Sequence, residues 1–261
     1  MSGFGERFHR AARERLDGFR RVAHASPLFS VRLRPFRQAR NLVANAGAGN
    51  RVGVPQHDVV PFVVEPKTGL NIPGEFCMRG ETKGCAPLMG MGVRVKRIAG
   101  VGVKVYACGL FLHPDAVKKA IGGTFFGKNP ARVAKDQTLF DFVVNDHAIG
   151  KTVRLVFARD LESSKIADAL AERLRPKLGA HSKSLKTFES YFENVKFAKG
   201  TSLTFCADHG KLRTLIKGKE IGVIDDKTMC AALFEVYLGK DPVVPGAKQS
   251  LGEKLAASVV G

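Results

Sequence analysis

The chain has 261 residues, a hydrophobic fraction of 44% and a net charge of +18. This length and composition fit one substantial domain with a tail, and no apolar run approaches the length of a membrane span, so we expect a soluble protein. The positive charge predicts attraction to phosphate groups at low salt, in lipid headgroups or nucleic acid, without specific recognition of a nucleic acid.

A basic segment opens the chain. Residues 1–58 contain 11 arginines, no lysine and four acidic residues. Between Phe4 and Val22 the apolar residues recur at helical spacing with arginines around them, which predicts an amphipathic helix. This pattern is typical of an organelle targeting peptide followed by a disordered linker, and its low serine content favours the mitochondrion over the plastid. The alternative is a helix that stays on the chain and lies on a membrane surface.

The domain itself is expected to span residues 59–261. Residues 59–65 predict an edge strand interrupted by Pro61, and residues 66–69 predict a turn. Residues 90–112 form two alternating runs that are typical of a β-hairpin, with a turn of small residues around Gly100. If Gly100 is the midpoint, three pairs face each other across the hairpin: Arg94 and Tyr106, Lys96 and Lys104, and Ile98 and Gly102.

The two faces of this hairpin differ in character. The face expected to lie toward the core carries Val93, Val95, Val103, Val105, Ala107 and Phe111. The other face joins the polar pair Arg94 and Tyr106 to an apolar floor made by Cys108, Leu110 and Leu112. A charged head beside an apolar floor suits an amphiphilic anion, although polar residues on the outer face of a half-solvated sheet are the common alternative.

The remaining elements follow in order. We expect a helix from His113 that ends at Gly122-Gly123, an irregular stretch over 124–150 with one short helix, and a strand over 152–159. Helices are predicted over 161–178 and 182–192, a meander of strands over 202–206, 212–217 and 220–224, and helices from 226 to 238 and 245 to 257. The pattern predicts an α+β fold, an antiparallel sheet with one layer of helices on it.

Motifs for other chemistry are not found in the sequence. The five cysteines are scattered without metal or redox spacing, so reduced structural thiols are expected. The seven histidines lie far apart, and the sequence has neither a phosphate-binding loop nor a serine nucleophile elbow. We therefore expect no metal and no cofactor.

Two stretches carry a resemblance to a known family. They are Gly-Val-Arg94 with Val-Lys-Val-Tyr106-Ala-Cys-Gly-Leu-Phe-Leu, and Cys230-Ala-Ala-Leu-Phe-Glu-Val-Tyr-Leu-Gly-Lys-Asp-Pro-Val243. Together they resemble the chalcone isomerase family, over about residues 59–255, and look closest to its non-catalytic, fatty-acid-binding branch. The resemblance implies a chalcone isomerase-like fold with an open-faced antiparallel sheet.

The resemblance also implies a site. Arg94 matches the site arginine of the enzymes, whereas Tyr106 stands where the enzymes have threonine and the fatty-acid-binding relatives have tyrosine. The other polar groups of the enzyme site fall at Ile166, Arg173 and Val236, so of the five only the arginine is kept. The ligand expected is a fatty acid or a similar small amphiphilic carboxylate, held by Arg94 and Tyr106 and enclosed by Cys108, Leu110, Ile166 and Val236.

Three alternatives remain open at this point. One is an intramolecular lyase that uses Arg94 to isomerise a chalcone-like phenol. Another is a basic, membrane-associated scaffold that makes transient membrane contact. The third concerns Arg94 alone, which could pair with a carboxylate such as Glu235 as a structural ion pair. The sequence leaves the oligomeric state open.

Overall fold

The computed structural model describes residues 61–77, 84–179 and 182–261. The expectations for residues 1–58, and for the start of the first strand, lie outside these residues. The strands are β1 (Phe62–Val64), β2 (Asn71–Pro73), β3 (Glu75–Phe76), β4 (Ala86–Ile98), β5 (Val101–Leu112), β6 (Lys151–Phe157), β7 (Leu161–Glu162), β8 (Lys196–Phe197), β9 (Ser202–Asp208), β10 (Lys211–Ile216) and β11 (Lys219–Asp225). The helices are α2 (Pro114–Phe125), α3 (Pro130–Val133), α4 (Gln137–Asn145), α5 (Ser163–Leu178), α6 (Lys183–Ser190), α7 (Lys227–Leu238) and α8 (Pro245–Val259).

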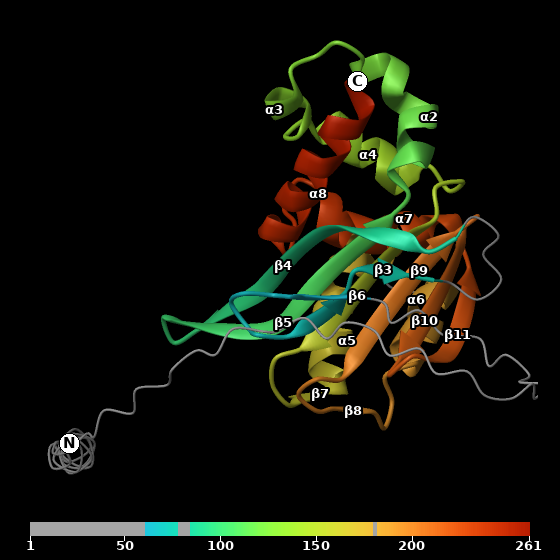
Figure 1. Ribbon diagram of the computed structural model, residues 1–261. Coiled ribbons are helices and arrows are strands. Elements are labelled where there is room, and N and C mark those ends of the chain that lie inside the picture. Colours follow the sequence, from blue (N-terminus) through green and yellow to red (C-terminus); the bar gives the residue numbers. More distant parts are fainter. Residues whose placement is uncertain (1–60, 78–83, 180–181) are drawn as a thin grey trace, which may run out of the picture. The chain divides into compact units, whose positions relative to one another are not determined.

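A seven-stranded antiparallel sheet organises the domain, in the order β11-β10-β9-β6-β5-β4-β3 (Figure 1). Strands that follow one another in sequence are neighbours here, except where β6 joins β9 after α5 and α6. The predicted meander is confirmed as β9, β10 and β11. The α+β class and the open sheet covered by helices are therefore both confirmed.

The main core lies on the face of the sheet that carries Tyr106. Cys108, Leu110 and Leu112 share this face and pack into one large cluster with the buried sides of the helices, α5 and α7 among them. The opposite face carries a much smaller cluster, in which Ala107 and Phe111 lie under β2 and the start of β4. The expected core face is thus wrong, because both faces of the hairpin are covered near its base and the helices cover the Tyr106 side.

The hairpin forms as predicted, but its register agrees with the prediction only up to Arg94. Arg94 lies opposite Tyr106, and an irregularity between Arg94 and Val95 then shifts every later pair by one residue. The turn consists of Ala99 and Gly100, both with positive φ, and is not centred on Gly100. The predicted pairs of Lys96 with Lys104 and of Ile98 with Gly102 are therefore wrong, because an unpaired residue in one strand rotates the tip relative to the base.

Helix α8 crosses directly over β4, and two glycines allow this close approach. A Cβ atom on Gly90 would lie 2.4 Å from the carbonyl oxygen of Ala247, and one on Gly92 would lie 2.6 Å from the Ala247 nitrogen. A side chain at either position would push the helix away from the strand. These glycines bring the start of α8 next to Arg94, which follows Gly92 by two residues.

The helical segments mostly match the predicted ranges. Ser182 caps α6 by accepting from the amide of Leu185, and Asp226 caps α7 through the amides of Thr228 and Met229. Helix α2 runs through Gly122 to Phe125, and the stretch expected to hold one short helix contains both α3 and α4. Tertiary packing of Phe125 and Phe140 overrides the local sequence signals there.

The expectation that all cysteines are reduced is wrong for one pair. Cys77 and Cys85 form a disulfide that joins the end of β3 to the start of β4. Their eight-residue separation gave no metal or redox signature, so only folding brings the two sulfurs together. Within the residues that the structure describes, none of the helices has both the length and the apolar character needed to cross a bilayer.

Candidate functional site

Arg94 and Tyr106 lie side by side where β4 passes under the loop between α7 and α8. The Arg94 Nη1 donates to the carbonyl oxygen of Val243 at 3.0 Å, and the side chain is half-buried. No carboxylate in the described ranges pairs with Arg94, and Glu235 instead pairs with Lys177 at 2.6 Å. The alternative of an Arg94–Glu235 ion pair is therefore wrong, and the guanidinium keeps donors that can bind an anion.

A third polar group, Tyr237 of α7, joins this pair and was not identified from the sequence. Its side chain is 1% exposed, and its hydroxyl has no well-formed hydrogen bond among the described residues. Tyr237 and Tyr106 interact through their side chains, and each phenol affects the pKa of the other, but the Tyr237 hydroxyl makes no hydrogen bond of normal geometry among the described residues. The sequence did offer one signal for Tyr237, because this tyrosine directly follows Val236 in the motif from Cys230 to Val243.

Burial sets the protonation of both phenols. Desolvation raises the pKa of Tyr106 and of Tyr237 well above the usual value for tyrosine, and the positive charge of Arg94 opposes this only in part. Both hydroxyls therefore stay protonated at neutral pH and can act as hydrogen-bond donors. An arginine with two buried phenolic donors is a set that suits a carboxylate.

The predicted apolar walls lie in the same core as the two tyrosines. Cys108 is 0% exposed, Leu110 2%, Ile166 7% and Val236 6%, and all four belong to the cluster that contains Tyr106 and Tyr237. Burial alone raises the pKa of the Cys108 thiol, so this cysteine is neutral and apolar in character. Arg173 does not join the site, because it points to the surface and pairs with Asp241 at 2.7 Å.

A surface pocket of about 460 Å³ opens next to this core. Val236 reaches it from inside, and the rest of its lining is polar: Asp141, Arg173, Lys177, Glu235, Gly239, Lys240 and Asp241. Arg94 and Tyr106 are not among the residues that line it. Of the predicted ligand-binding residues, only Val236 lines this pocket.

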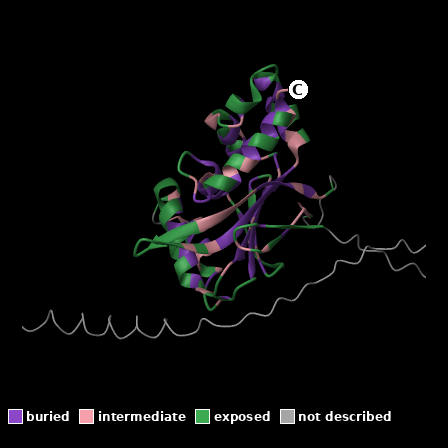
Figure 2. Ribbon diagram, turned by 60° about the vertical axis from the view of Figure 1, so that its left-hand side comes forward, coloured by how far each residue is buried: buried purple, intermediate pink, exposed green. Residues whose placement is uncertain are grey.

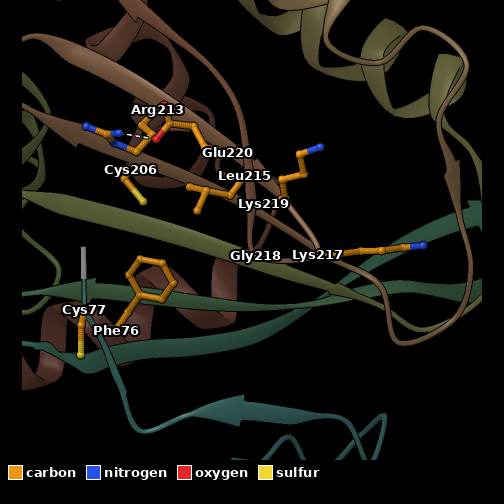
Figure 3. Close-up of a pocket in the computed structure, with 9 residues that line it drawn as sticks. All are labelled: Phe76, Cys77, Cys206, Arg213, Leu215, Lys217, Gly218, Lys219 and Glu220. Atoms are coloured by element: carbon orange, nitrogen blue, oxygen red, sulfur yellow. Dashed lines mark hydrogen bonds and ion pairs between the residues drawn. The ribbon is translucent and has the colours of Figure 1, made fainter. Parts of the chain in front are cut away.

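A larger pocket of about 720 Å³ lies on the other face of the sheet, between β3 and the strands β9 to β11 (Figure 3). Its arginine, Arg213, is already paired with Glu220, and Lys217 and Lys219 extend away from its centre. An arginine neutralised by its own partner and lysines in solvent bind an anion weakly. We therefore place the candidate ligand site at Arg94, Tyr106 and Tyr237 and not in this larger pocket.

One group of possible metal ligands comes together in the described part of the chain: Glu75, Cys77 and Cys85. The two sulfurs are joined as a disulfide, so neither can act as a thiolate ligand.

Comparison with known proteins identifies the family. Residues 82–258 match the family described as chalcone-flavanone isomerase. The chain belongs to the chalcone isomerase family. The match includes both strands of the hairpin and most of α8, so Arg94, Tyr106 and Tyr237 all lie inside it.

Members of the family with different functions resemble the chain almost equally. Fatty-acid-binding protein 2 of Arabidopsis thaliana is 26% identical over 204 residues, which is 75% of this chain and 51% of that protein, so the chain spans only about half the length of this relative. Chalcone–flavanone isomerase of Hordeum vulgare is 27% identical over 188 residues, 67% of this chain and 81% of the enzyme. Overall identity therefore does not separate a fatty-acid-binding protein from an isomerase.

Structural comparison gives the same family fold. A crystal structure of an Arabidopsis thaliana fatty-acid binding protein matches with a TM-score of 0.65 at 24% identity, covering 76% of this chain and 99% of that one. At this level of identity the match establishes the chalcone isomerase-like fold, and the ligand has to be argued from the side chains at the site.

Proposed function

We propose that this protein binds a fatty acid without chemical conversion, with the carboxylate held by Arg94, Tyr106 and Tyr237. The observation that supports this most directly is the Tyr237 hydroxyl, which is buried and lacks a well-formed partner among the described residues. Leaving such a group unpaired costs about 1–3 kcal/mol. A carboxylate could accept one hydrogen bond from the Tyr237 hydroxyl and a second from the Tyr106 hydroxyl, and would lie against the charge of Arg94.

The surroundings of the trio favour an alkyl chain over a polar ligand. Cys108, Leu110, Ile166 and Val236 are neutral, apolar side chains of the same buried cluster as the two phenols. Each buried methylene contributes about 0.8 kcal/mol, and each hydrogen bond to the charged carboxylate about 1.5–3 kcal/mol. Ordering of the chain and loss of free motion offset most of this gain, so we expect dissociation constants in the micromolar range.

The same walls argue against isomerase chemistry. Closing the ring of a chalcone develops negative charge on an enolate, and groups that donate hydrogen bonds must lie where this charge forms. Ile166 and Val236 have no donor to offer, and Arg173, the third position matched to the enzyme site, is engaged with Asp241 at the surface. An intramolecular lyase that uses Arg94 is therefore the second candidate.

Ligand extraction followed by binding measurements tests the proposal. Protein purified from cells should release an acyl chain detectable by mass spectrometry, and the delipidated protein should bind laurate or palmitate in isothermal titration calorimetry. Arg94→Gln should weaken binding about tenfold or more, because it removes a charge-assisted contact. Arg213→Gln, which changes an arginine on the opposite face of the sheet, is the matched control and should leave the affinity unchanged.

Three results would refute the assignment. The first is that the purified protein releases no fatty acid and the delipidated protein binds neither laurate nor palmitate. The second is an equal loss of affinity in Arg94→Gln and Arg213→Gln. The third is cyclisation of a chalcone that disappears in Arg94→Gln. The last result would establish the isomerase alternative. We also propose that residues 1–58 direct the protein to an organelle and are then removed. Recovery of the protein from cells with Met1 still in place would contradict this second proposal.

A further inference from the structure

The hairpin of β4 and β5 extends beyond the rest of the sheet. β6 pairs with β5 only from Tyr106 to Leu112, and the amide of Ala158 donates to the carbonyl oxygen of Val105, so residues 101–104 of β5 have only β4 as a paired neighbouring strand. This two-stranded ribbon, residues 95–104, is called the hairpin tip below. Figures 1 and 2 show it projecting from the body of the domain and largely exposed. A ribbon of two strands is marginally stable by itself. Because this one projects beyond the core, core packing does not explain its composition.

The exposed aliphatic residues of the hairpin tip are Ile98 and Val101, which flank the turn and are called the apex below, and Val95 nearer the base. Val95 is 44% exposed, Ile98 53% and Val101 65%, and none of the three belongs to a core cluster. Ile98 and Val101 lie opposite each other on either side of the Ala99-Gly100 turn, where hairpins in water usually carry polar residues. The apex therefore offers aliphatic side chains that have no partner in the described part of the protein.

The charges around this apex have a single sign. The hairpin from Ala86 to Leu112 contains no acidic residue, and its cations Lys96, Arg97 and Lys104 are exposed next to the apolar apex. Lys104 also donates to the carbonyl oxygen of Lys67 and so keeps the turn after β1, with its own exposed lysine, beside the tip. Aliphatic residues surrounded by lysine and arginine match the boundary between lipid headgroups and acyl chains.

We propose that the hairpin tip docks on an anionic lipid bilayer, with Ile98 and Val101 inserted at the headgroup level and Lys96, Arg97 and Lys104 among the phosphates. The tip is a projection and not a groove, and it carries no acidic group to pair with a basic partner protein. A nucleic acid would satisfy the cations but leave the aliphatic apex in water. This contact holds whether or not a fatty acid occupies the site at Arg94.

The position of the tip also bears on the proposed ligand site. Arg94 precedes Ile98 by four residues on the same strand, a distance of about 13 Å at the rise of a β-strand. A docked tip therefore brings the carboxylate-binding trio close to the membrane surface, from which a fatty acid could be taken up.

The chain contains no tryptophan, so one introduced indole reports on one position. Ile98→Trp should give a blue-shifted emission with phosphatidylglycerol-containing vesicles, and lipids brominated along the acyl chain should quench it. Phe126→Trp is the matched control, since Phe126 is 73% exposed and follows α2, outside the hairpin tip. Its emission should stay unshifted in the same full-length protein, including when residues 1–58 bind the vesicles.

Charge reversal provides a second, independent measurement. The double variant Lys96→Glu with Arg97→Glu should lower vesicle affinity about tenfold or more, whereas the same change at Lys118 and Lys119, two exposed lysines of α2, should have a much smaller effect. Circular dichroism checks that each variant is folded. An indole at position 98 that is neither shifted nor quenched, or one that behaves like the indole at position 126, would overturn the proposal. Equal losses in the two charge variants would do so as well.

Discussion

Replacement of Tyr237 by phenylalanine tests the proposed site most directly, because stability and binding should move in opposite directions. Tyr237→Phe removes one buried hydroxyl that has no well-formed partner among the described residues and keeps the ring that fills the core. Since such an unpaired group costs about 1–3 kcal/mol, the ligand-free variant should be at least as stable as the parent, by up to about 3 kcal/mol. With ligand, the variant lacks one donor to a carboxylate, a loss of about 1.5–3 kcal/mol.

Binding should therefore weaken by about 10- to 150-fold at unchanged or increased stability. Urea denaturation of delipidated protein gives the first quantity, and calorimetric titration with laurate or palmitate gives the second. Tyr191→Phe is the control, because Tyr191 follows α6, is only partly buried and is the only other tyrosine besides Tyr106. A loss of more than about 1 kcal/mol of stability in ligand-free Tyr237→Phe would refute the reasoning, since the hydroxyl would then have a good partner already.

Further predictions address the fold. Gly90→Ala should destabilise the domain by about 2 kcal/mol or more, because the new Cβ meets the Ala247 carbonyl, whereas Gly246→Ala, which meets nothing closer than 4.0 Å, should be neutral or slightly stabilising in denaturant titrations. Burial lowers the pKa of Lys151 to about 8, so the unfolded chain binds more protons between about pH 8 and 10.5. The parent should therefore gain up to about 3 kcal/mol relative to Lys151→Met as pH rises through this window, and a flat difference would contradict it. Thiol titration in denaturant should count three free cysteines before reduction and five after, and five before reduction would exclude the Cys77–Cys85 disulfide.

The hairpin of β4 and β5 shows how much of the fold the local alternation of residues can predict. Alternation of apolar and polar residues predicted both strands, and the pair of Arg94 with Tyr106 is correct. The pattern did not predict the irregularity after Arg94, because adding one unpaired residue leaves each strand equally regular in sequence. The same irregularity separates the base of the hairpin, which carries Arg94 and Tyr106, from its exposed tip.

For the candidate site, sequence reasoning could bring together only some of the residues that the fold places side by side. Its two residues on β4 and β5 follow from the register of one hairpin, which is a local property of the chain. Tyr237 comes from α7, more than 100 residues later, and its burial beside Tyr106 depends on how that helix lies over the sheet. Likewise, the choice of the helix-covered face could not be made from the hairpin, because both faces are apolar near its base.

The sequence by itself determined the succession of elements, the caps that begin α6 and α7, and the membership of the chalcone isomerase family, since these depend on residue order and short-range geometry. Tertiary structure alone decided which hairpin face became the main core, which two cysteines meet, and which groups surround Arg94. Such outcomes depend on contacts between residues far apart in the chain, where burial, charge and close packing are set jointly by segments whose local patterns carry no information about one another.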